Sequence, residues 1–451
     1  MRAIILVDLG FGDSGKGLLT DYLVRRTGAT VVIRYNGGAQ AGHNVVTRDG
    51  RHHTFAQFGA GTFAGARTFL SRHVVVHPPA LLREGELLRA KGVVDAFRLL
   101  RVSEEARLIT PYHQAAGRLR ELARGGARHG SCGVGVGEVV RADHEHPEET
   151  VRARDLRAPA PLRSKLRRVR ERLREEIETL REPPGPVAAR ERSVFERDDV
   201  LDRWLSEAAR LVELDLLAPD AALAEWMQDA RCVVFEGAQG VLLDEWHGFH
   251  PYTTWSRCTP DNALELLAEM APQAEVERIG VLRAHAVRHG PGPLPTETGE
   301  LAAAVCEHNG DGEWQGRVRY GWFDPVLVRY ALDVVGPLEG VALTHVDTPS
   351  RLGTWRVGAG YRLPAAPETA DLVPERTAGG RVDRLVVPAG RCLARQARLT
   401  ELLEGATPCL EECAPTAEGV LETTERLLSR PIDLVSRGPR AGDVTSRADQ
   451  R

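Results

Sequence analysis

The sequence predicts an α/β protein built on one large, mainly parallel central sheet that is flanked by helices. Strand-like apolar runs alternate with helix-like patterns along the chain, which is typical of such sheets. The first run, Ile4–Val7, leads into a glycine-rich loop at residues 10–17 and then into a helix-like stretch from Leu18. This order indicates a phosphate-loop-like strand–loop–helix, and 451 residues allow a large core with insertions.

The remaining elements follow from short apolar runs and helical spacing. The expected strands are Ala3–Val7, Thr30–Arg34, His73–Val76, Cys232–Phe235, Arg278–Ala284 and Val341–His345. Apolar residues recur every three or four positions between Leu162 and Glu182, which predicts a surface amphipathic helix that ends at the proline-rich residues 183–186. We therefore expect one domain over residues 1–451, with a helical insertion at about 145–215 and a frayed polar tail from about Ala441.

Composition excludes several classes of protein. The net charge of −4 gives no electrostatic footprint for nucleic acid, and no apolar run approaches the ~20 residues that span a membrane. The seven cysteines form no C-x-x-C pair; Cys409 and Cys413 could share a helix face but are expected to be inert thiols. An odd cysteine count without a signal peptide predicts a cytoplasmic protein.

The glycine-rich loop at residues 10–17, called the glycine loop below, predicts a phosphate site that contains an acid. Its glycines let the backbone approach an anion closely, and Lys16 adds a point charge. Gly10 to Lys16 fits the G-x-x-x-x-G-K spacing, but Gly17 replaces the usual Ser or Thr that holds Mg²⁺. Asp13 is the expected substitute, because Mg²⁺ prefers a hard carboxylate beside phosphates. The alternative is a simple tight turn.

Three further loops are dense in glycine and carry polar side chains. Residues 37–44 place His43 at the end of a predicted strand, where open α/β sheets bind ligands; the alternative is a turn histidine. Residues 130–137 suit a second phosphate or a mobile linker. Residues 235–240 present Gln239, whose amide can read a base edge, unless the segment is only a tight turn.

Two later segments carry charge. Arg317 and Arg319 are expected on the same side of an extended loop, where they could clamp a carboxylate or phosphate or simply lie on the surface. Asp347 ends another predicted strand, and its carboxylate can accept the N1–H and exocyclic amine of guanine.

Taken in order, these segments resemble the adenylosuccinate synthetase family, which couples GTP hydrolysis to the joining of aspartate to IMP. The matching segments are GDSGKG at 12–17, GGAQAGHN at 37–44, GSCGVGVGE at 130–138, FEGAQGVLLD at 235–244, HGFHPYTT at 247–254, RHGPGPLPTE at 288–297, GRVRYGWFD at 316–324, LTHVD at 343–347 and SRGP at 436–439. They span nearly the whole chain. The resemblance implies the same fold class, a homodimer and Mg²⁺ as cofactor.

The resemblance also implies roles for individual residues. Asp13 matches the group that removes the N1 proton of the purine, and His43 the general acid that stabilises the transferred phosphoryl group; Lys16 and Gln239 complete the catalytic set. The implied nucleoside triphosphate site is Gly12, Ser14, Gly15, Lys16, Gly17, Gly42, Arg319, His345, Asp347, Ser436, Arg437 and Gly438. The implied purine monophosphate site is Asp13, Gln40, Ser131, Gln239, Thr254 and Arg317. Aspartate would contact Trp314, Gln315, Gly316, Arg317 and Arg319, and Mg²⁺ would contact Asp13 and Gly42.

Departures from the family pattern cluster around the substrates. Ser14 replaces an acid, Gln40 an asparagine, the pair 314–315 two threonines, and His345 a lysine. Arg152 or Arg154 is the nearest match to the family's intersubunit arginine. The reaction type is therefore expected to be preserved, with IMP as acceptor. The alternatives are (d)GMP or another purine-like acceptor, possibly with ATP, and a non-catalytic GTP-binding protein.

Overall fold

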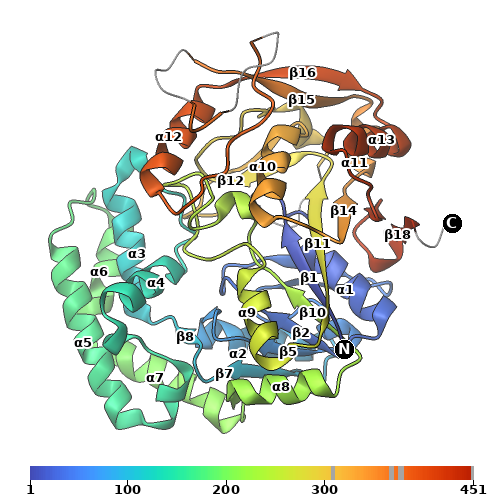
Figure 1. Ribbon diagram of the computed structural model, residues 1–451. Coiled ribbons are helices and arrows are strands. Elements are labelled where there is room, and N and C mark those ends of the chain that lie inside the picture. Colours follow the sequence, from blue (N-terminus) through green and yellow to red (C-terminus); the bar gives the residue numbers. More distant parts are fainter. Residues whose placement is uncertain (306–309, 365–369, 374–379, 448–451) are drawn as a thin grey trace.

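A computed structural model describes residues 1–305, 310–364, 370–373 and 380–447 and confirms the predicted α/β class (Figure 1). Its central sheet has ten strands in the order β18-β17-β14-β11-β1-β10-β2-β5-β7-β9. Every neighbouring pair in it is parallel except β17 and β18. The bounds in that order are Val444–Ser446, Leu434–Ser436, Gly340–Thr344, Glu275–Arg283, Arg2–Asp8, Cys232–Glu236, Val31–Arg34, Arg67–Leu70, Leu100–Ser103 and Leu217–Ala218.

The central strand β1 is apolar along its length because helices cover both faces of the sheet. Ile4 and Leu6 pack with residues of α1 (Lys16–Thr27), whereas Ile5 belongs to the core on the other face. That second core includes residues of α8 (Asp220–Gln228), α9 (Asp261–Met270) and α10 (Pro325–Val335). The glycine loop therefore leaves a strand that is fixed from two sides.

The other helices extend the molecule at its edges (Figure 1). They are α2 (Pro78–Ala90), α3 (Pro111–Ala123), α4 (Val136–Glu145), α5 (Pro159–Glu178), α6 (Pro186–Glu196), α7 (Asp198–Glu213), α11 (Asp347–Leu352), α12 (Leu393–Glu404) and α13 (Ala417–Leu428). The predicted amphipathic helix is α5, and its apolar residues Val169 and Leu173 are buried against Leu119 of α3. The helical region thus includes α3 and begins before the predicted boundary at about 145.

Two predicted elements were misplaced. The expected strand His73–Val76 is reduced to β6 (Val75–Val76), which pairs with β8 (Arg107–Leu108) outside the main sheet. The main sheet uses β5 instead, a four-residue strand too short to give a clear period. Cys409 and Cys413 lie on strand β16 (Thr407–Cys413), paired with β15 (Trp355–Arg362), rather than on a helix.

The C-terminal segment from Ala441 is ordered where a frayed tail was expected. Residues Val444–Ser446 form β18, which pairs antiparallel with β17 at the edge of the main sheet. An edge strand is held by backbone hydrogen bonds and needs few apolar side chains, so its polar composition was misleading. Residues 448–451 lie outside the described part of the chain.

The ligand loops meet at the carboxyl edge of the sheet, where open parallel sheets place their sites. The glycine loop follows β1, residues 37–42 follow β2, and residues 237–240 follow β10; β10 lies between β1 and β2 in the sheet. Within the residues that the structure describes, no helix is long and apolar enough to cross a membrane.

Candidate active site

A cavity of about 680 Å³ lies where these loops converge. Its size and mixed polar lining suit substrates of nucleotide size. Many of the sequence-predicted residues line it: Gly12, Asp13, Lys16, Gln40, Gly42, His43, Ser131, Gln239, Thr254 and Gln315. The structure therefore brings together groups that lie up to 300 positions apart in the chain.

The glycine loop is organised by a carboxylate that sequence reasoning missed. Asp8, at the end of β1, accepts hydrogen bonds from the Gly10 amide at 2.9 Å and from the amide and hydroxyl of Ser14 at 3.1 and 2.8 Å. Its Oδ2 also lies 2.7 Å from Lys16 Nζ in a buried ion pair. Asp8 thus holds both the loop backbone and the lysine in place before any ligand binds.

Neighbouring loops touch the glycine loop through glycines. A Cβ on Gly240 would lie 2.2 Å from the Gly10 carbonyl oxygen and 2.6 Å from the Gly12 amide nitrogen. A Cβ on Gly17 would lie 2.9 Å from the backbone of His43. These close approaches fix the spacing between the loops that follow β1, β2 and β10.

Asp13 is held at its side chain by His289, the last residue of β12 (Ala286–His289), and at its main chain by Arg283, the last residue of β11. Its carboxylate Oδ2 accepts a hydrogen bond from His289 Nε2 at 2.7 Å, and its main-chain carbonyl accepts one from Arg283 Nη1 at 2.9 Å. Its backbone is left-handed, with φ of 56°. Burial raises the pKa of Asp13, but the hydrogen bond and charge of His289, with Lys16 and Arg283, outweigh burial and lower the pKa to about 2. The carboxylate is therefore ionised at neutral pH.

His43 is paired with a buried acid, Glu236, at the end of β10. The His43 Nδ1 and Glu236 Oε1 atoms are 2.6 Å apart, and Glu236 Oε2 accepts from the Ala60 amide at 3.0 Å. Burial lowers the pKa of His43, although Glu236 opposes the shift. With Nδ1–H donated to Glu236, the ring presents Nε2 to a ligand, as in other histidines oriented by a carboxylate.

Two side-chain amides lie over the turn at residues 37–38. A Cβ on Gly37 would lie 3.0 Å from Gln239 Oε1, and one on Gly38 would lie 3.0 Å from Gln40 Oε1. Gln239 is itself left-handed, with φ of 56°. In the described part of the chain, neither amide oxygen accepts a hydrogen bond. Both amides line the cavity and can read the edge of a base.

The loop at residues 130–137 forms another wall of the cavity. The Ser131 hydroxyl accepts a hydrogen bond from the Gly133 amide at 3.2 Å, and Arg118 Nε donates to the Gly133 carbonyl at 2.9 Å. Ser131 lines the cavity together with Thr254. This wall offers hydroxyl and amide donors, which suits a phosphate group.

The two predicted arginines, Arg317 directly before β13 (Val318–Gly321) and Arg319 within it, do not form one clamp. Arg319 Nη1 donates to the carbonyls of Gly290 and Gly292 at 3.0 and 2.9 Å, and its Nη2 lies 2.9 Å from Glu297 Oε2. Arg317 is exposed. Because the Arg319 donors are committed to the fold, Arg319 acts as a brace of this loop and only Arg317 presents its guanidinium outward.

The remaining predicted residues gather beside the cavity rather than in its wall. His345 and Asp347 follow β14, and the adjacent strand β17 ends at Ser436, whose carbonyl accepts the Val346 amide at 3.4 Å. Arg437 and Gly438 follow Ser436 directly. The Asp347 carboxylate lies 3.0 Å from Arg351, so a base would have to share it with that guanidinium. Trp314 stacks on Arg118, with 5.4 Å between the guanidinium and the ring centroid.

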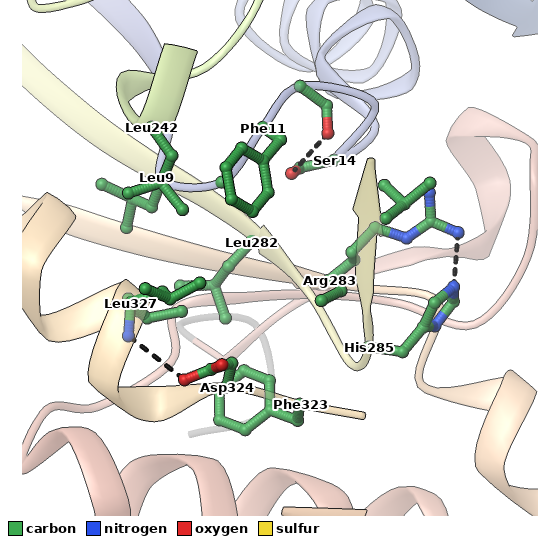
Figure 2. Close-up of a pocket in the computed structure, with 15 residues that line it drawn as sticks. Leu9, Phe11, Ser14, Leu242, Leu282, Arg283, His285, Phe323, Asp324 and Leu327 are labelled. Atoms are coloured by element: carbon green, nitrogen blue, oxygen red, sulfur yellow. Dashed lines mark hydrogen bonds between the residues drawn. The ribbon is translucent and has the colours of Figure 1, made fainter. Parts of the chain in front are cut away.

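A second cavity, of about 40 Å³, lies behind the glycine loop (Figure 2). Figure 2 shows Phe11 of the glycine loop and Leu9, directly before that loop, facing the cavity, with Asp324 opposite at the start of α10. It is too small for a nucleotide and is a packing space. Asp324 caps α10 by accepting from the Val326 and Leu327 amides at 3.2 Å, and it accepts the Tyr361 hydroxyl at 2.7 Å. Burial raises the pKa of Asp324 to about 6 against these bonds.

Possible metal ligands are few. Among the residues that the structure describes, no group of three or more His, Cys, Asp or Glu could hold a metal ion. The cavity does offer the Asp13 carboxylate and the main chain of Gly42. One or two protein oxygens, completed by phosphates and water, are the usual Mg²⁺ environment in phosphoryl-transfer sites.

Neither candidate for an intersubunit arginine is directed away from its own chain. Arg152 Nη2 lies 3.0 Å from Asp143 Oδ1, and its Nη1 donates to the Glu105 carbonyl at 3.0 Å. Arg154 pairs with the Glu105 side chain. Both guanidinium groups are thus paired within their own chain, although the Arg154 side chain is exposed.

Sequence reasoning missed Asp8, Glu236, Arg283 and His289. Asp8 and Glu236 each close a buried apolar run, and a lone acid at the carboxyl end of a buried strand is a signal that could have found them. Arg283 and His289 carry no such signal, because their contacts with Asp13 cross about 270 positions.

Comparisons with known proteins agree on one family. A family model described as adenylosuccinate synthetase matches residues 5–445. The adenylosuccinate synthetase of Nitrosomonas europaea is 31% identical over 451 residues, covering 97% of this chain and 96% of that protein.

Two solved structures share the fold. A fully ligated adenylosuccinate synthetase from Plasmodium falciparum superposes with a TM-score of 0.78 at 18% identity, over 99% of this chain and 100% of that chain. The succinoaminodeoxyadenylate synthetase of cyanophage S-2L, bound to dGMP and to dATP as an energy donor, superposes with a TM-score of 0.55 at 17% identity, over 99% and 95%. At these identities both matches show the fold alone.

Proposed function

The chain belongs to the adenylosuccinate synthetase family, and from this premise we propose that it joins L-aspartate to C6 of IMP at the expense of GTP, in purine nucleotide biosynthesis. The observation that carries the proposal is the single cavity lined by Asp13, Lys16, His43 and Gln239. It places a base, a cation, an acid and an amide around one substrate volume. We propose that residues 1–451 act as one domain of this kind.

In the first step, the Asp13 carboxylate takes the N1 proton of the purine, and O6 attacks the γ-phosphorus of GTP; the bond from that phosphorus to the β,γ-bridging oxygen breaks, and GDP leaves. Asp13 suits this role because it is ionised and held in the cavity wall. Lys16 retains two N–H donors beyond its contact with Asp8, and with the glycine-loop amides it spreads the charge on the transferred group. The Gln239 amide orients the purine at position 6.

In the second step, the amine of aspartate displaces phosphate from C6. Phosphorylation is needed because an oxide-like O6 is a poor leaving group. His43, oriented by Glu236, acts in its doubly protonated form: Nε2–H donates to the phosphoryl group and passes its proton to the phosphate as it leaves. Arg317 binds a carboxylate of aspartate from the loop formed by Trp314, Gln315 and Gly316, and Arg319 braces that loop.

Asp13 and the Gly42 carbonyl would hold Mg²⁺, which when bound neutralises phosphate charge. Ser131, Thr254 and Gln40 would bind the purine monophosphate.

The nucleoside triphosphate would be bound in two parts. Gly12, Ser14, Gly15 and Gly17 would hold its phosphates; His345, Asp347, Ser436, Arg437 and Gly438 would recognise its base. We further propose a cytoplasmic homodimer, because the family resemblance implies that assembly and the proposed substrates are intracellular metabolites.

A substrate matrix tests the proposal. Phosphate release and product mass are measured with IMP, GMP or dGMP, each with and without aspartate, and with GTP or ATP. The expected result is release that requires IMP, aspartate and GTP together and yields a product of adenylosuccinate mass. Turnover with dGMP and none with IMP would show that dGMP, not IMP, is the acceptor. Turnover with ATP and none with GTP would show that ATP, not GTP, is the phosphoryl donor. Binding of GTP with no turnover under any condition would indicate a non-catalytic GTP-binding protein.

A further inference from the structure

We propose that His289 is a positioning residue that holds the Asp13 carboxylate in its reactive orientation, an inference that rests on the proposed function. His289 Nε2 lies 2.7 Å from Asp13 Oδ2, and both residues line the large cavity. None of the roles implied by the family resemblance includes this histidine. The contact therefore adds a residue to the machinery of the reaction.

The contact with His289 acts on the Asp13 side chain, whereas two other hydrogen bonds hold the backbone of the glycine loop around Asp13. Arg283 Nη1 donates to the Asp13 carbonyl at 2.9 Å, and Asp8 holds the adjacent Ser14 amide at 3.1 Å. These bonds fix the main chain on both sides of the Asp13 side chain. The carboxylate is 22% exposed to the cavity, so rotation about its two side-chain torsions must be limited by a direct partner. His289 is that partner.

A carboxylate can accept the imidazole N–H and still receive the substrate proton. Its two oxygens offer about four lone-pair positions, and a donor at Oδ2 uses one of them while fixing the plane of the group. A planar base fixed in this way presents its remaining lone pairs in a constant direction. Catalytic groups held within about 10–20° of the productive geometry gain most from such support.

His289 is itself carried by a rigid element. It ends β12 (Ala286–His289), where it pairs with Val318 of β13. The neighbouring Arg288 is buried and donates to the carbonyls of Pro291, Pro293 and Tyr252 at 2.9 to 3.1 Å. His289 thus connects Asp13, the proposed base, to β13, the strand that follows the proposed aspartate-binding loop.

Three variants separate positioning from folding. His289→Gln places an amide N–H close to the position of Nε2–H, whereas His289→Met fills similar space without a donor. His146→Met, at a histidine outside the cavity lining, controls for a general effect of the substitution. The readouts are kcat and the acceptor KM for phosphate release from GTP.

We expect His289→Met to lower kcat at least about tenfold with the acceptor KM within about threefold, and His289→Gln to restore kcat to within about threefold of the native chain. A native kcat in His289→Met, or equal losses in both variants, would overturn the inference. A crystal structure of ligand-free His289→Met gives a test that does not depend on the reaction. In that structure the Asp13 carboxylate should leave its native rotamer. An unchanged rotamer would overturn the positioning role, whichever substrates the enzyme uses. If the native chain shows no turnover, only the proposed function is overturned.

Discussion

Replacing Glu236 by glutamine tests the pairing that prepares His43. Glu236 is fully buried, and its two oxygens are assigned to different partners, Oε1 to His43 and Oε2 to the Ala60 amide. Glutamine has the same shape but only one acceptor oxygen. Because the Ala60 N–H requires that oxygen, the glutamine NH₂ group must face His43 Nδ1. The imidazole then loses its anionic partner and is forced into the tautomer protonated on Nε2.

The size of the effect follows from the charge that is lost. A hydrogen bond to a charged group contributes about 1.5–3 kcal/mol, compared with about 1 kcal/mol for a neutral bond. The difference, about 0.5–2 kcal/mol, applies to the protonated form of His43, which stabilises the phosphoryl group. At 1.36 kcal/mol per factor of ten, this corresponds to a decrease in kcat of about 2- to 30-fold. The KM for GTP should change little, because the ground state makes little use of that charge.

The assay is steady-state phosphate release with GTP, IMP and aspartate, together with urea unfolding of each variant. Glu84→Gln is the matched control, because Glu84 is also a buried acid that accepts backbone amides, from Ala56, Gln57 and Phe58, but it lies outside the cavity lining. Glu84→Gln should lower the free energy of unfolding and leave kcat unchanged. A kcat for Glu236→Gln within about twofold of the native value would refute the reasoning.

Three further predictions concern the frame around the site. Lys16→Met leaves the buried Asp8 carboxylate without its ammonium partner and should lower the free energy of unfolding by about 3–5 kcal/mol in a urea titration, with part of the loss recovered by adding Asp8→Asn. Asp324 has its pKa raised from 3.8 to about 6, so the stability that it contributes is fully present below about pH 3.8 and is lost as the pH rises through about 6. The free energy of unfolding should fall by about 3 kcal/mol between pH 4 and pH 7 for this reason, and Asp324→Asn should lack this fall. If both proteins show the same dependence of the unfolding free energy on pH, Asp324 is not its source. Gly240→Ala places a Cβ 2.2 Å from the Gly10 carbonyl oxygen and should cost about 1–3 kcal/mol of stability and weaken GTP binding, whereas an unchanged melting temperature and Kd would show that the loops are not packed as described.

The sequence was sufficient to predict the parts of the site that are local in the chain. Residues 10–16 belong to one strand–loop–helix unit. Because the glycines, the lysine and the acid of this segment are close in the sequence, their spacing alone predicts that they form one site. The same holds for Gln239, in the loop that follows β10, and for His43, in the segment that follows β2; β10 neighbours β1 in the sheet, and β2 neighbours β10. Their convergence follows from parallel topology.

Contacts between distant segments were not predictable in this way. The partner of His43 is 193 positions away and that of Asp13 is 276 positions away, and nothing in local spacing pairs them. Arg319 shows a second limit of prediction from the sequence, which does not indicate which polar side chains bind other parts of the fold. The pattern Arg-x-Arg predicted two ligand-binding groups, but it did not indicate that the turn at residues 290–292 presents two carbonyls to Arg319, whose guanidinium donates to both. Tertiary packing decides which polar groups form hydrogen bonds within the protein and which remain available to a ligand.

Transfer of the acceptor oxygen to phosphate tests the central claim most directly, namely that O6 of the purine is phosphorylated and then displaced. IMP labelled with ¹⁸O at position 6 is converted with GTP and aspartate in unlabelled water, and the released phosphate is analysed by mass spectrometry. We expect one ¹⁸O atom in each phosphate formed with product. Unlabelled phosphate, or label found only when the water carries ¹⁸O, would contradict it and indicate hydrolysis of GTP without phosphorylation of the purine.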